Sequence, residues 1–371
     1  MPEFKSIDVF KGARDAAQPA ARLEEVRARS RAFRGVLEAG NKVLYYKACE
    51  LVRVPYPTRY AFTNCYTQGF AVTPIIHIVN RLFVIQYDTK AGVKTLLFSP
   101  SDIMANAETR FFKRLGGGKV SDMATSGGRV QQLAQKVIAP IRNTVEGWLG
   151  HVGLAPEDID YLSYDHLHTQ DVRNWLGSTD RDPYFPNAKL LIMREEWEAA
   201  QGLVPPQIDW YCPDGIAGID PSRVELLDSD TMLGDGLALI RTPGHTMGNH
   251  SLVAHTDDGV LVSSENGVSA DTYAPESSKI PAIRKYAQAT KMEVVLNGNT
   301  QESGLEQYIS MVQEKQMAGP NRSNPAFTNV FPSSEFASHW LFRGIKPTYW
   351  FGDREYGSLQ RSARAAKSSA A

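Results

Sequence analysis

The chain has 371 residues, a formal net charge of −1 and 42% hydrophobic residues. This length suffices for one large hydrophobic core or two smaller ones, and the near-neutral charge gives no electrostatic reason to expect nucleic acid or an anionic membrane surface as a partner. The cysteines Cys49, Cys65 and Cys212 are scattered without CxxC spacing, and no apolar run approaches the length of a membrane span. We therefore expect reduced thiols and a cytoplasmic protein.

The first predicted element is an amphipathic helix over residues 19–39. Its apolar stripe is incomplete and consists of Leu23, Val26, Phe33 and Leu37. Arginines cover the rest of this helix, and we expect them to form a solvated face. They are Arg22, Arg27, Arg29, Arg31 and Arg34.

From residue 42 onward the pattern changes to strand-like runs separated by Pro, Gly, Asn and Asp turn residues. The predicted strands of this part are 43–48, 75–79, 82–87 and 95–98. Further strands are predicted directly before His166 and over 189–193, 237–241, 251–254, 259–263 and 294–296. Helices are predicted over 128–149, from Arg194 onward and over 279–291.

Strand-rich halves with interspersed helices indicate an α/β protein in which two sheets pack face to face and helices cover the outside. The tail from Arg361 is rich in Ala, Ser and Arg, and we expect it to be disordered.

The most informative motif is His166-Leu167-His168, at the end of a predicted strand. Two histidines separated by one residue in an extended segment project to the same side, so both imidazoles can reach a single ion. A third histidine, His245, lies in the Pro-Gly turn of residues 242–246 and also follows a predicted strand. Three histidines are the minimum set of a catalytic zinc or iron site that keeps positions open for water and substrate.

Together these segments resemble the metallo-β-lactamase-fold superfamily over roughly residues 42–312. Residues 149–171 resemble the approach to that family's His-x-His-x-Asp-His motif, and residues 242–251 resemble its third-ligand turn. The resemblance implies an αβ/βα sandwich of two mixed β-sheets flanked by helices, with the metal site at the edge between the sheets. We expect three parts: an N-terminal helical extension over 1–41, the metallo-β-lactamase-like domain over 42–318, and a C-terminal extension with the disordered tail over 319–371.

The family pattern binds two metals, and this chain departs from the pattern at the second one. The three histidines of the first site are retained. The second-site positions read Gln170, Asp171 and Asn299, and the bridging aspartate maps to Glu265. Amide and carboxylate oxygens hold zinc less well than imidazole does. The resemblance therefore implies one tightly held transition-metal ion, zinc before iron, with a second metal weak or absent.

Two carboxylates are candidate catalytic groups. Asp171 or Glu265 would take a proton from water and later deliver it to the leaving group. Glu265 is also a candidate fourth metal ligand or a partner that orients an imidazole, and a weak second ion would use Asp171 and Glu265. Asp165, Gln170 and Asn299 are candidates for contacts to the ligands or to the substrate.

Three functions stay open on the sequence alone. The first is a metal-dependent hydrolase, in which a metal-bound hydroxide attacks an ester, lactone, thioester, amide or phosphoester of a small molecule. The second is a mononuclear iron oxygenase or oxidoreductase on the same fold, and the third is a non-catalytic ligand-binding protein. We expect a small-molecule substrate and neither nucleic acid nor membrane as partner. The N-terminal helix and residues 319–360 are available for packing in a homo-oligomer.

Overall fold

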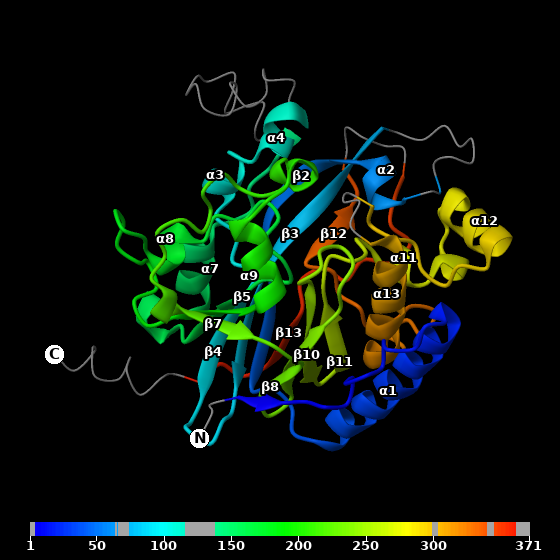
Figure 1. The fold of residues 1–371 in the computed structure, drawn as a ribbon, viewed down its shortest axis with the longest axis horizontal. Coiled ribbons are helices and arrows are strands. Elements are labelled where there is room, and N and C mark those ends of the chain that lie inside the picture. Colours follow the sequence, from blue (N-terminus) through cyan, green and yellow to red (C-terminus); the bar gives the residue numbers. More distant parts are fainter. Residues whose placement is uncertain are drawn as a thin grey trace.

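The computed structural model describes residues 4–63, 65, 74–115, 138–298, 303–339 and 345–360. Within them the chain forms two β-sheets packed face to face, with helices on both outer faces (Figure 1). The predicted α/β sandwich is confirmed. None of the described helices combines the length and the apolar character needed to cross a bilayer.

The smaller sheet has five strands in the order β1-β8-β9-β10-β11. They are β1 Lys5–Ser6, β8 Thr231–Gly234, β9 Leu237–Arg241, β10 His250–Thr256 and β11 Gly259–Ser263. All four strand pairs are antiparallel, whereas two mixed sheets were expected. The reason is local, because β8 to β11 follow one another through short connections, and such connections can join only antiparallel neighbours.

The larger sheet has the order β13-β2-β3-β4-β5-β6-β7, with β12 paired to β3. Its strands are β2 Tyr45–Pro57, β3 Ile75–Tyr87, β4 Lys94–Phe98, β5 Tyr161–Ser163, β6 Lys189–Met193, β7 Val224–Leu227, β12 Ser334–Ala337 and β13 Glu355–Gly357. Strands β4 to β7 are parallel and the other pairs are antiparallel. The carboxyl ends of β4 to β7 therefore meet at one edge, where loops can place functional side chains.

The helices lie on the two outer faces and in the connections. They are α1 Pro19–Ala39, α2 Thr58–Ala61, α3 Ile103–Asn106, α4 Arg110–Leu115, α7 Val145–Val152, α8 Arg173–Leu176, α9 Arg194–Gln201, α10 Pro205–Ile208, α11 Ala270–Tyr273, α12 Pro281–Thr290 and α13 Gly304–Ala318. Short 3₁₀ turns are η2 Pro156–Asp158, η3 Pro221–Arg223 and η4 Pro275–Ser277. Helices α1 and α13 pack on each other and on β11, while α9 packs on β6 and β7.

Alternating side chains of the strands build separate apolar layers. In β9, Leu237 and Leu239 face the core between the two sheets, whereas Ala238 and Ile240 face the core under α1 and α13. In β3, Phe83 and its alternate neighbours join the core between the sheets, while the intervening side chains face the layer of α7 to α9. This period of two is what a sheet covered on both faces requires.

Three sequence predictions of secondary structure were wrong in part. The runs 75–79 and 82–87 form one strand, because Arg81 does not end it but pairs with Glu335 inside the protein. The predicted helix 128–149 is not helical over 139–144, where Pro140 lies, and α7 begins only at Val145; residues 128–137 lie outside the described residues. The predicted strand 294–296 is not formed, although Val294 and Val295 are buried and Leu296 is half-buried.

The arginines of α1 do not form the solvated face that was expected. Arg22 pairs with Glu306 at 2.6 Å, and Arg27 pairs with Glu293. Arg34 donates to the Gln316 carbonyl over 3.2 Å, and of the five only Arg31 is classed as exposed. These side chains attach α1 to α13 and to Glu293. The polar face of the helix therefore packs against polar groups of the protein.

Both flanks of the chain add strands to the sheets. Strand β1 pairs with β8, and strands β12 and β13 pair with β3 and β2. The division into three parts at 41 and 318 stays a prediction, as does the disorder of the tail, which lies outside the described residues.

Candidate metal centre

The first two histidines lie on the loop that follows β5. The chain leaves the sheet after Ser163, bends at Asp165 and continues through His166 to His168, which forms an isolated bridge with Tyr211. Leu167 lies between them and packs into the apolar layer under α7 to α9. This apolar anchor turns the flanking imidazoles to the opposite side, as the spacing predicted.

The third histidine lies on the turn after β9. Gly244 has a φ of 140°, and a Cβ on it would lie 2.2 Å from the backbone nitrogen of Gln307 in α13. Only glycine fits both the conformation and the contact. The turn is thereby seated against α13, and His245 extends from it toward the other two histidines.

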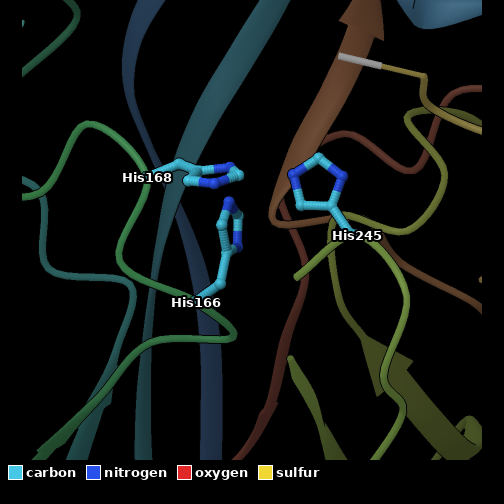
Figure 2. Close-up of side chains that lie close together, drawn as sticks. All are labelled: His166, His168 and His245. Carbon is cyan, nitrogen blue, oxygen red and sulfur yellow. The ribbon is translucent and has the colours of Figure 1, made fainter. Parts of the chain in front are cut away.

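The three imidazoles converge (Figure 2). One nitrogen from each of His166, His168 and His245 lies within 4.8 Å of the others, and the ring centroids are 4.5 to 5.2 Å apart. The three side chains belong to residues that are 3%, 4% and 0% exposed. Three ligand atoms at this spacing surround a position that one transition-metal ion can fill.

The lowered pKa values of His168 and His245 suit metal ligands. Burial lowers the pKa of His168 and His245 well below the usual histidine value, and the neighbouring His166 lowers both further. Both ring nitrogens of His168 are buried without a hydrogen-bond partner among the described residues. Buried nitrogens are normally satisfied, so a neutral imidazole with an unused lone pair fits a metal ligand.

Asp165 orients the first histidine. The Nδ1 atom of His166 lies 3.0 Å from Asp165 Oδ1. Burial alone would lower the pKa of His166, but the adjacent carboxylate outweighs burial and raises it to about 9. Burial acts to raise the pKa of Asp165, but the attraction of His166 together with the hydrogen bonds from His166 and Ser333 outweighs burial and lowers it. A carboxylate that holds Nδ1–H leaves Nε2 as the ligand atom, a common arrangement around protein metals.

Glu265 lies beside this pair. A carboxylate oxygen of Glu265 lies within 4.8 Å of ligand atoms of both Asp165 and His166, in a second group of candidate metal ligands. Burial raises the pKa of Glu265 to about 7, although His166 acts in the opposite direction. Its predicted roles as ligand, base or orienting partner all remain compatible with this position.

A single buried carboxylate connects the two ligand-bearing loops. Glu196 of α9 accepts hydrogen bonds from the backbone nitrogen of Leu167 at 2.8 Å and from the hydroxyl of Thr246 at 2.5 Å. Tyr211 donates its hydroxyl to the same side chain over 2.9 Å. Three donors compensate the burial of this charge, and they also fix one histidine loop relative to the other.

A second buried carboxylate supports the His245 turn from α13. Glu314 accepts from Tyr273 at 2.6 Å and from the side-chain amide of Asn266 at 2.7 Å. Asn266 in turn accepts the backbone N–H of His245 over 3.2 Å. His245 is thus positioned through Asn266 and Glu314.

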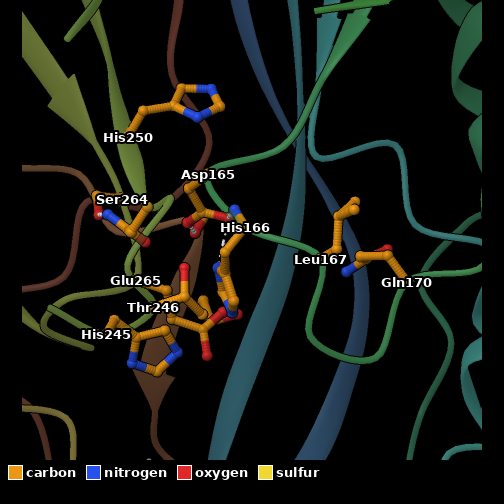
Figure 3. A network of polar contacts seen from close by, with 12 residues as sticks. Asp165, His166, Leu167, Gln170, His245, Thr246, His250, Ser264 and Glu265 are labelled. Atoms are coloured by element: carbon orange, nitrogen blue, oxygen red, sulfur yellow. Dashed lines mark hydrogen bonds and ion pairs between the residues drawn. The ribbon is translucent and has the colours of Figure 1, made fainter. Parts of the chain in front are cut away.

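Asp171 and Gln170 have polar partners other than the three histidines. Asp171 forms an ion pair with Arg173 and belongs to neither candidate metal group of the described residues. Gln170 accepts from Asn106 at 3.1 Å and lines a cavity of about 650 Å³ on the far side of the histidine loop. In Figure 3, Leu167 and Gln170 point away from Asp165 and Glu265. Asn299 lies outside the described residues.

The sequence alone gave no role to the residues that hold the ligands in place. They are Glu196, Thr246, Asn266, Glu314 and two serines of the C-terminal segment, Ser333 and Ser334. Glu196 belongs to a short segment that resembles the sequence found in the family after the histidine motif. This resemblance was a usable signal. The serines carried none, because Ser333 meets its partner Asp165 across a separation of 168 residues.

Comparison with known proteins supports the fold. A probable metal-dependent hydrolase from Staphylococcus aureus superposes with a TM-score of 0.51 and 11% identity, covering 87% of this chain and all of the other. The chain has the metallo-β-lactamase fold. No family model matches the chain.

Curated relatives match a part of the chain. An N-acyl homoserine lactonase from Bacillus cereus is 30% identical over 114 residues, which are 31% of this chain and 40% of that protein. An N-acyl homoserine lactonase from a Bacillus species is 29% identical over 109 residues, or 29% of this chain and 38% of that protein. The chain thus spans about two fifths of the length of the curated relatives it matches.

Proposed function

We propose that the chain is a metal-dependent hydrolase. The observation that carries this proposal is the convergence of His166, His168 and His245, with a ligand atom of each within 4.8 Å of the others. The unused ring nitrogens of His168 support it, because they are buried where a cation would give them a partner.

The reaction needs an activated water and a group that moves a proton. A transition-metal ion on three histidines supplies Lewis acidity and lowers the pKa of water from 15.7 to about 7. Glu265 would take the proton as the water oxygen forms a bond to the carbonyl carbon, and would return it to the oxygen that leaves. Its raised pKa of about 7 suits a group that must both accept and release a proton near neutral pH.

A lactone is the substrate class to test first. The curated relatives are N-acyl homoserine lactonases, and ring opening of a lactone is ester hydrolysis, the chemistry that this site supports. The same proton transfer applies to the other esters, thioesters and amides, so the choice among these classes rests on the relatives alone.

The deciding experiment joins metal analysis to an activity assay. Protein purified without chelator is expected to carry one zinc ion per chain and to open the ring of an N-acyl homoserine lactone. The proton released on ring opening, titrated at constant pH, measures the rate. His168→Ala removes a ligand and should lower the rate by more than the ~100-fold that loss of an outer contact brings. Protein without a bound transition ion would refute the proposal. Iron together with oxygen uptake would favour an oxidoreductase, and substrate binding without turnover would favour a ligand-binding protein.

A further inference from the structure

We propose that the C-terminal segment 331–337 is a working part of the metal centre, with Ser333 and Ser334 as positioning residues for its carboxylates. The inference rests on the proposed metal site and adds to it the residues that hold Asp165 and Glu265. These serines lie beyond residue 318, where the metallo-β-lactamase-like domain was expected to end.

Ser333 completes the hydrogen bonding of Asp165. Its hydroxyl donates to Asp165 Oδ2 over 2.6 Å, while Oδ1 of the same carboxylate lies 3.0 Å from His166 Nδ1 and 3.0 Å from the His166 backbone nitrogen. Each oxygen therefore has a fixed donor, and the carboxylate cannot rotate without losing one. Because the ring of His166 follows the carboxylate, Ser333 sets the direction of the nitrogen offered to the metal.

Ser334 acts on the other carboxylate. Its hydroxyl donates to Glu265 Oε2 over 2.8 Å. The hydroxyls of these two consecutive serines, Ser333 at a bend and Ser334 at the start of β12, thus reach two different carboxylates. The pair thus controls both acidic groups that flank His166.

The segment that carries the serines is anchored on both sheets. The backbone nitrogens of Phe331 and Ser333 donate to the carbonyls of Val262 at 2.8 Å and Ser264 at 3.3 Å, next to β11. On the other side, β12 pairs with β3, and Arg81 of β3 donates to buried Glu335 at 2.7 Å. The hydroxyls of Ser333 and Ser334 consequently reach the site from a rigid support.

A purely structural role is the alternative, in which the hydroxyls only compensate buried charge. Zinc affinity separates the two, because only a positioning role alters how well the ligands meet the ion. Ser278 supplies a matched control. It is a buried serine whose hydroxyl donates to the Asp271 carboxylate at 2.5 Å, and Asp271 belongs to neither candidate metal group of the described residues.

The test uses the full chain stripped of metal, with Zn²⁺ affinity measured by competition with a chromophoric chelator. Ser333→Ala should weaken Zn²⁺ binding by about 10- to 100-fold, Ser333→Thr should stay within about threefold of wild type, and Ser278→Ala should leave affinity unchanged. The visible spectrum of the Co²⁺ form should change in Ser333→Ala and stay the same in Ser278→Ala. Ser334→Ala should shift the pH profile of hydrolysis.

Each outcome has a distinct meaning. Folded Ser333→Ala with wild-type Zn²⁺ affinity and an unchanged Co²⁺ spectrum overturns the inference. If Ser333→Ala does not fold, Ser334→Ala decides, and an unchanged pH profile with an unchanged Co²⁺ spectrum overturns the inference. If the wild-type chain binds no Zn²⁺, the proposed function fails and this inference fails with it. If it binds Zn²⁺ but opens no lactone, the affinity test still stands.

Discussion

The hydroxyl of Thr246 donates to Oε2 of Glu196, and this contact links the turn of the third histidine to the loop of the first two. The other oxygen of Glu196 accepts the backbone N–H of Leu167. One carboxylate therefore fixes the distance between the two loops. All of these atoms are buried, where an unmet hydrogen-bonding group is costly. The relative position of the two histidine loops therefore depends on Glu196, a residue of α9 that belongs to neither loop.

Thr246→Val tests this link, because valine keeps the shape of threonine and lacks the hydroxyl. The buried carboxylate loses one of its three donors, and the free energy of unfolding should fall by about 1–3 kcal/mol. Urea unfolding measures this change, and chelator competition should show weaker Zn²⁺ binding. Thr231→Val is the control. Thr231, the first residue of β8, donates its hydroxyl to the Ser229 carbonyl at 2.8 Å. Equal Zn²⁺ affinity in both variants would contradict the proposed link.

Gly244 should tolerate no side chain. A Cβ there would lie 2.2 Å from the Gln307 backbone nitrogen, and its φ of 140° is unfavourable for any other residue. We expect Gly244→Ala to lower the free energy of unfolding by at least about 2 kcal/mol and to displace His245. Gly150→Ala is the opposite case, because Gly150 lies within α7 with nothing near its Cβ position. It should stabilise by roughly 0.5–1 kcal/mol in thermal unfolding. A Gly244→Ala protein as stable as wild type would show that the turn is not seated as described.

Removal of the metal should lower the stability of the whole chain. A ligand that binds only the folded state adds about 2.7 kcal/mol at a concentration of 100 times its Kd. Dialysis against a chelator should therefore lower the midpoint of thermal unfolding, and Zn²⁺ should restore it whereas Mg²⁺ should not. In His168→Ala the midpoint should respond much less to either treatment. If neither chelator nor Zn²⁺ changes the midpoint of wild-type unfolding, the three histidines do not bind a metal ion.

Asp230 should make stability depend on pH. Burial raises its pKa from 3.8 to about 6, although the Arg241 backbone N–H donates to it at 2.7 Å. Between these two values the folded chain keeps a proton that the unfolded chain releases. The contribution of Asp230 is therefore complete below pH 3.8 and is lost as the pH rises through about 6.

Asp230→Asn cannot ionise, so its stability relative to wild type should increase from pH 4 to pH 7. The increase should approach about 3 kcal/mol, at ~1.4 kcal/mol for each pH unit between the two pKa values. Urea unfolding of both proteins across this range measures it. A difference that does not vary with pH would mean that Asp230 ionises normally in the folded chain.

The sequence predicted the parts of the molecule that local patterns determine. The spacing of His166 and His168 and the Pro-Gly turn before His245 are properties of a few consecutive residues, and strands such as β9 and β11 are short apolar runs. Helix α1 was predicted from its apolar stripe and has the predicted bounds, with a proline as its first residue and a glycine after its last.

Other features depend on partners that are distant along the chain. The sequence divided β3 at Asn80 and Arg81, because it does not show that Glu335 pairs with Arg81 inside the protein, and Ser333 has no signal beside it that points to Asp165. Asp171 was a candidate ligand by alignment, yet Arg173, two residues away, pairs with it. Such choices are made by tertiary contacts, which a pattern along the chain does not record.

The histidines come from different layers of the sandwich: two leave β5 of the large sheet, and the third leaves β9 of the small one. A cation bound by all three would thus cross-link the two sheets of the sandwich. The packing of the two sheets on each other and the proposed activity would then depend on the same three nitrogens. A substitution that lowers one of these properties should rarely leave the other unchanged.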